Sequence, residues 1–142
     1  MKDQLVGTWL VVSLKTTSED KVSFPLGEKP GGFVTMTSSR IWLLFVDPSR
    51  KQPTSPTLTE AEAASAMKTH VSWTGNYKTE ETSEGLKLTS RVDAASSQAL
   101  AGTDRVYFVR VDGDRLFMKS PAVIVPMTGK TSIVAIELVK SE

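Results

Sequence analysis

Eight short apolar runs, separated by turn-forming residues, constrain the fold of this chain more than any other feature. The runs are rich in Val, Ile, Leu, Phe and Trp, and they are interrupted by Gly, Pro, Ser and Asp, a pattern typical of strands and turns. Strands are therefore predicted near 7–15, 32–37, 40–47, 72–80, 85–93, 103–111, 114–120 and 131–139. Eight successive strands predict an all-β fold, either an antiparallel up-and-down barrel or a sandwich.

Short polar connections indicate that neighbouring strands pair as hairpins. Asp112-Gly113 stands between two alternating runs, and a glycine there accepts the positive φ that a two-residue turn requires. The segments 37–40 and 82–85 are further tight-turn candidates. Consecutive antiparallel pairing follows from these turns.

One segment, 59–71, is predicted to be a helix. Thr59 and Glu62 have the spacing of a capping box, and the residues that follow are good helix formers without Gly or Pro. The helix follows the proline-rich stretch 48–56, so the two are expected to form a loop and lid over one end of the barrel. The small, polar segment 94–102 is a second candidate rim loop.

Composition excludes several classes of function. The length of 142 residues suits one domain, 1–142, and the 17 basic and 16 acidic residues are mixed, so neither a nucleic-acid nor a membrane partner is predicted. The absence of cysteine excludes disulfides, iron–sulfur clusters and thiol nucleophiles, and we predict no metal and no cofactor. Without an apolar signal segment at the start, and with 41–46 too short to span a bilayer, the chain is expected to be cytoplasmic.

Five motifs occur along the chain in a definite order. They are Leu5-Val6-Gly7-Thr8-Trp9, Pro25-Leu26-Gly27 with Pro30-Gly31-Gly32-Phe33, Trp73-Thr74-Gly75-Asn76-Tyr77, Gly102-Thr103, and Asp112-Gly113-Asp114-Arg115-Leu116. In this order they resemble the bacterial and fungal lipocalin-like domain family, a group of small single-domain proteins. The resemblance implies an eight-stranded barrel around a small-molecule cavity. Because barrels that resemble this family occur beside biosynthetic genes, it also implies a cofactor-free isomerase, cyclase, dehydratase or lyase.

The chain departs from the family at three places. A histidine is common where Ser90 or Arg91 stands, an aromatic stretch is usual at 94–101, and Trp-Glu-Arg is replaced at 136–138. A family mechanism is therefore not transferred residue by residue. Trp9, after Gly7, is expected to seal the floor of the barrel, which places the functional site at the opposite end.

Alternate residues of a barrel strand face inward, and this parity selects the candidate site residues. Taking Trp9 as inward, Val11 and Ser13 follow on the same face. The interior is then mostly apolar with a few polar points, as a small-molecule site requires. The predicted catalytic residues are Arg105, Tyr107 and His70, and the predicted ligand-binding residues are Trp42, Trp73, Tyr77, Ser90, Leu88, Val109 and Met118.

Each polar candidate has two interpretations. Arg105 pairs either with a carboxylate, phenolate or enolate of a ligand or with a residue such as Glu137 across the barrel. The hydroxyls of Tyr77 and Tyr107 donate either to a ligand or to a carbonyl at the rim. His70, the only histidine, is expected at the end of the helix, as a general acid or base or as a residue favoured there by the helix dipole.

The strand that contains Trp42 is apolar on both faces, so its outer face is expected to be covered by the helix or by a second subunit of a homodimer, or to stay exposed. We predict that the partner of the barrel is a small hydrophobic organic molecule. Three functions fit: a cofactor-free enzyme of biosynthesis, a non-catalytic carrier or sensor, and a structural barrel.

Overall fold

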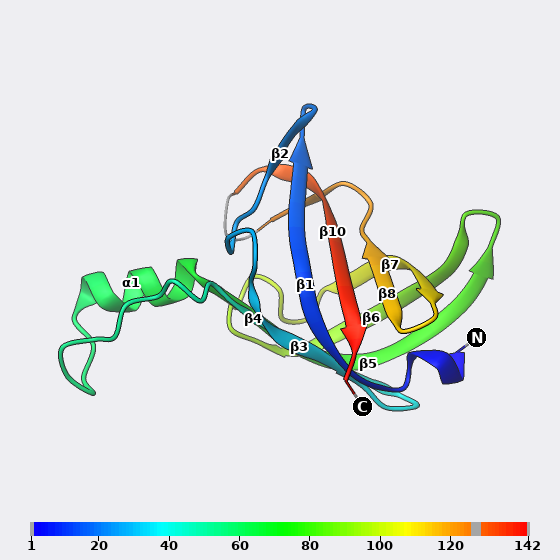
Figure 1. Ribbon diagram of the computed structural model, residues 1–142, viewed down its shortest axis with the longest axis horizontal. Coiled ribbons are helices and arrows are strands. Elements are labelled where there is room, and N and C mark those ends of the chain that lie inside the picture. The colour runs from blue at the N-terminus through cyan, green and yellow to red at the C-terminus, as the bar shows by residue number, and fades with distance from the viewer. Residues whose placement is uncertain (1, 126–128, 142) are drawn as a thin grey trace.

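The computed structural model, which describes residues 2–125 and 129–141, is a closed antiparallel barrel of eight strands (Figure 1). The barrel strands, in chain order, are β1 (Gly7–Ser18), β3 (Gly31–Met36), β4 (Arg40–Val46), β5 (His70–Thr82), β6 (Gly85–Ala95), β7 (Asp104–Asp112), β8 (Arg115–Lys119) and β10 (Thr131–Lys140). Each strand pairs with the next, and β1 closes the barrel by pairing with β10. The eight predicted strands and the barrel are confirmed, and closure excludes the sandwich.

Two short strands extend the barrel wall. Strand β2 (Lys21–Ser23) pairs with the end of β1, and β9 (Val123–Ile124) pairs with the start of β10. The turn between β1 and β2 consists of Glu19 and Asp20, both at positive φ. The turn between β7 and β8 consists of Gly113 and Asp114, one residue later than predicted, because Asp112 still pairs with Arg115 and Gly113 supplies the positive φ of +61°.

Trp9 closes one end of the barrel, as predicted. Its ring is 1% exposed, and its Nε1 donates to the Leu5 carbonyl oxygen at 2.9 Å, within the 3-10 helix η1 (Lys2–Leu5). Leu5 is fully buried, and the Lys140 ammonium lies 4.6 Å from the centroid of the Trp9 ring. Both termini lie at this end (Figure 1).

A β-bulge in β1 changes which residues face inward. The register shifts between Val11, which pairs with Leu138, and Ser13, which pairs with Glu137. A bulge adds one residue to one strand only and so reverses the alternation beyond it. The prediction that Ser13 faces inward with Trp9 is therefore wrong, and Leu14 and Thr16 are buried instead.

The helix α1 (Glu60–Lys68) begins as predicted but does not form a lid. Thr59 Oγ1 accepts a hydrogen bond from the Glu62 amide at 3.1 Å, and Glu62 accepts one from the Thr59 amide at 2.9 Å, which lowers the pKa of Glu62. No residue of α1 is buried, and the helix projects away from the barrel (Figure 1). Its apolar residues are mainly alanines, which form no wide apolar stripe to pack on the barrel.

Trp42 lies on the outer face of β4. Ile41, Leu43 and Phe45 are buried, so the alternation directs Trp42 outward, where it is 48% exposed. Its ring contacts Phe33 edge-on, with the centroids 5.5 Å apart. The expectation that the helix covers this face is wrong, and the homodimer stays a prediction.

Candidate functional site

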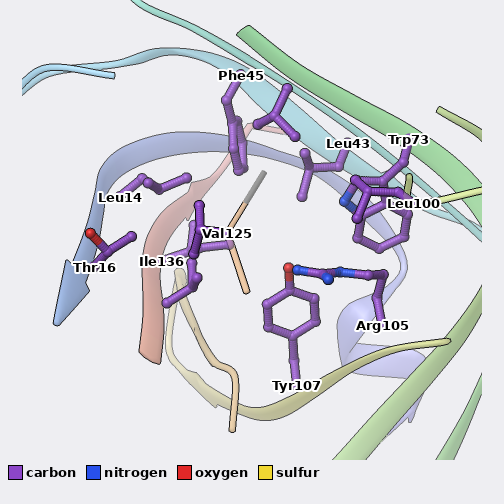
Figure 2. A pocket seen from close by; sticks show the side chains of 12 residues that line it. Leu14, Thr16, Leu43, Phe45, Trp73, Leu100, Arg105, Tyr107, Val125 and Ile136 are labelled. Carbon is purple, nitrogen blue, oxygen red and sulfur yellow. The ribbon is translucent and has the colours of Figure 1, made fainter. Parts of the chain in front are cut away.

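A small cavity lies inside the barrel (Figure 2). Its lining residues Leu14 and Thr16 lie farther along β1 than Trp9, toward the other end of the barrel. Its lining is mostly aliphatic and aromatic, with Thr16, Arg105 and the Tyr107 hydroxyl as the polar points. The lining residues are Leu14, Thr16, Leu43, Phe45, Val71, Trp73, Leu100, Arg105, Tyr107, Val125, Val134 and Ile136. Apolar walls with a few polar groups are typical of small-molecule sites.

The cavity is small in this structure, with a volume of about 40 Å³. An apolar protein cavity that takes up benzene measures about 150 Å³. Two lining side chains, those of Leu100 and Val125, come from segments between strands and are 5% and 3% exposed. A ligand with one ring therefore requires lining side chains to move, and Leu100 and Val125 are candidates because they lie outside the barrel strands.

Arg105 is the only charged residue in the lining, and it has no protein partner among residues 2–125 and 129–141. Its Nε is buried without a hydrogen bond, although β7 places the guanidinium at the cavity. Glu137, the alternative partner considered from the sequence, instead accepts from Arg115 at 2.9 Å. The pairing of Arg105 with Glu137 is thus wrong, and a buried guanidinium nitrogen is left to bind something else.

Tyr107 and Trp73 form the aromatic part of the wall beside Arg105. Tyr107 is two residues from Arg105 on the same face of β7, and Figure 2 shows its hydroxyl pointing toward the guanidinium. The rings of Trp73 and Tyr107 are nearly parallel, with an interplanar angle of 4° and centroids 6.5 Å apart. Of the predicted site residues, the structure brings together Arg105, Tyr107 and Trp73.

Seven of the ten predicted site residues lie outside the cavity lining, and three of the seven make contacts elsewhere or face outward. The Tyr77 hydroxyl donates to the Thr37 carbonyl oxygen, and burial, with a smaller contribution from Asp3, raises the pKa of Tyr77. His70 is the first residue of β5 rather than the last of the helix, and its Nδ1 lies 2.8 Å from the Ala66 carbonyl oxygen. Trp42 faces outward on β4, so the interior placement expected from the sequence does not hold.

The other predicted ligand-binding residues are buried in the filled part of the barrel. These residues, which are buried but do not line the cavity, are Leu88, Ser90, Val109 and Met118. Ser90 pairs with Arg105 across β6 and β7, and its Oγ is buried without a hydrogen bond among the described residues. The predicted alternation was thus correct about which side of the strand these four residues occupy. It does not say how far along the barrel axis each of them lies.

Sequence reasoning missed most of the aliphatic lining. Leu14 and Thr16 were missed because the bulge is not visible in the sequence pattern, and Leu100 and Val125 because they lie outside the barrel strands. Leu43 and Phe45 face the cavity from β4, and the sequence did not decide which face of this strand points inward. The alternation of Val134 and Ile136 in β10 was a usable signal.

The cavity is suited to holding an oxygen anion on an apolar skeleton. A guanidinium offers several donors in a fixed plane, and the Tyr107 hydroxyl adds another donor nearby. The twelve lining residues include neither a carboxylate nor an imidazole, so none of them is a ready general base.

Comparison with known proteins gives one match. The profile of the family described as "Lipocalin-like domain" matches residues 6–140. Neither a curated protein nor a solved structure matches the chain. In the part of the chain that the structure describes, no helix is long and apolar enough to cross a membrane. The match covers nearly the whole chain and agrees with the closed eight-stranded barrel, so the protein belongs to the lipocalin-like domain family.

Proposed function

We propose that this barrel binds a small, largely apolar organic anion, with its negatively charged oxygen held by Arg105. One observation carries the proposal: the guanidinium reaches an apolar cavity and has no ion pair or hydrogen bond within residues 2–125 and 129–141. Polar groups that are buried in proteins normally have a hydrogen-bond partner, so a cation whose Nε is buried without one in an apolar cavity favours an anionic ligand.

The apolar lining and the cation have separate roles in this proposal. Burial of the ligand skeleton against Leu14, Phe45 and Ile136 supplies affinity in proportion to the apolar area removed from water, about 25 cal/mol per Å². Arg105 supplies selectivity for charge, because a hydrogen bond to a charged group contributes about 1.5–3 kcal/mol. The family membership supports small-ligand binding, and Arg105 narrows the ligand to an anion.

A second candidate function is catalysis without a cofactor, as an isomerase, cyclase, dehydratase or lyase of biosynthesis. Arg105 and Tyr107 are neighbouring donors in a small, apolar site, where fixed donors stabilise an enolate oxygen as its charge develops. The walls would hold a flexible substrate in its reactive conformer. In the non-catalytic alternative, a carrier or sensor, the same contacts hold the ligand unchanged. The cytoplasmic location stays a prediction.

Titration with benzoate and benzamide at pH 7 tests the binding proposal. The two probes have nearly the same shape, and only benzoate is charged. Calorimetry is expected to show benzoate binding at least about tenfold more tightly, which corresponds to about 1.4 kcal/mol. In Arg105→Met the preference should disappear, while Arg110→Met, on the outer face of the same strand, should keep it. Equal affinity of the wild type for both probes, or binding of neither, would contradict the proposal.

Turnover separates the enzyme from the carrier. If the barrel is catalytic, a metabolite that it converts should be converted far more slowly by Tyr107→Phe and by Arg105→Ala, with the thermal midpoint unchanged or raised. A carrier should release the same metabolite chemically unchanged, as mass spectrometry of the bound and released ligand would show.

A further inference from the structure

The rings of Trp73 and Tyr107 are parallel and together form the aromatic wall of the cavity. The residues come from β5 and β7, with β6 between them, and both side chains are almost fully buried. Their planes differ by only 4° although they lie on different strands. Elsewhere the lining is mainly aliphatic, with Phe45 as a third aromatic residue.

Arg105 stands at the edge of this wall. Residues 105 and 107 share the inner face of β7, and the Tyr107 hydroxyl points toward the guanidinium (Figure 2). When Arg105 holds the oxygen anion of a ligand, the ligand atoms bonded to that oxygen group therefore lie beside the two rings. The shape of this part of the ligand, flat or puckered, decides how well it packs against the aromatic wall.

We infer that the ligand is a planar, conjugated oxyanion, such as an aromatic or unsaturated carboxylate, a phenolate or a dienolate. This inference rests on the proposed binding of an organic anion and narrows it to one shape. A flat conjugated group lies parallel to both rings and gains offset or edge contacts that a puckered saturated group cannot make. A flat ligand also needs the least widening of a cavity of about 40 Å³.

Benzoate and cyclohexanecarboxylate, titrated by calorimetry, separate shape from charge. Both carry one carboxylate and seven carbons, and only benzoate is flat. Benzoate is expected to bind about 3- to 10-fold more tightly, the range that aromatic pairing contributes beyond buried area. Tyr107→Phe, which keeps the ring, should retain this ratio. Tyr107→Leu and Trp73→Leu should bring it close to one.

Trp42→Leu and Tyr77→Phe are matched controls, because both residues lie outside the cavity lining and their substitution should leave the ratio unchanged. If Trp73→Leu does not fold, the ratio of the two affinities in Tyr107→Leu, compared with the ratio in Tyr107→Phe, still tests the role of the aromatic wall. Equal binding of benzoate and cyclohexanecarboxylate, with benzoate still preferred over benzamide, would refute the inference of a planar ligand and would still support the anion site. Loss of the preference over benzamide would overturn both.

Discussion

Replacing Arg105 by methionine is predicted to stabilise the fold, contrary to the usual effect of removing a buried arginine. The Nε of Arg105 is buried without a partner, and an unsatisfied buried polar group costs about 1–3 kcal/mol. Because the rest of the side chain is only partly buried, the lower end of that range applies. Methionine keeps a similar length, is unbranched and matches the apolar lining.

The free energy of unfolding of Arg105→Met is therefore expected to rise by about 1 kcal/mol, and its thermal midpoint by about 3 °C. Urea unfolding at pH 7 without ligand measures the first, and calorimetry the second. Arg110→Met is the control, since Arg110 makes an exposed ion pair with Asp112 and its loss should lower stability by less than about 1 kcal/mol.

Benzoate should remove most of the difference in unfolding free energy between the two proteins. At about ten times its dissociation constant it stabilises the wild type by about 1.4 kcal/mol, but a variant that binds tenfold more weakly gains only about 0.4 kcal/mol. A fall in unfolding free energy of 3–5 kcal/mol for Arg105→Met, the cost of breaking a buried ion pair, would refute the reasoning. Such a fall would mean that Arg105 holds the barrel together.

Three further predictions concern the cavity, the barrel wall and its charges. Leu100→Ala should bind benzoate more tightly, by about 3- to 10-fold in calorimetry, because the side chain that the ring displaces is gone, and its unfolding free energy should fall by about 2 kcal/mol. Gly75→Ala should lower the unfolding free energy by at least about 2 kcal/mol in urea, because a Cβ would lie 2.2 Å from the Arg91 carbonyl oxygen; an unchanged urea midpoint would contradict this close approach. Asp93 accepts hydrogen bonds from Thr74 and from Arg40, which lower its pKa in the folded protein below 3.8. Its contribution to stability is therefore present above that pH and lost as the pH falls through the folded value, so Asp93→Asn should flatten the acid limb of the urea midpoint measured against pH.

The strands were predictable because their signals are local. A strand needs alternation over a few residues and a turn at each end, and both can be seen in runs such as 103–111 and 114–120. The start of α1 was predictable for the same reason, since a capping box involves residues three apart. Its end was not, because His70 leaves the helix to pair with Val46 on a neighbouring strand.

The cavity was predictable only in part. Parity placed Arg105, Tyr107 and Trp73 inside the barrel, and the structure places them together in its wall. Parity could not tell that Leu88 and Met118 lie in the filled part, because depth depends on the tilt and stagger of strands around a closed barrel.

By itself, the amino-acid sequence determined the strand content, the hairpin pairing and the inward side of strands such as β5 and β7, because these follow from contacts between near neighbours in the chain. The tertiary structure alone decided the rest. Barrel closure between β1 and β10 brings Leu14 and Ile136 into one cavity, a bulge reverses part of β1, and Glu137 pairs with Arg115 and not with Arg105. Arg105 is left unpaired by the side chains that surround it, and those side chains come from segments that are far apart in the sequence.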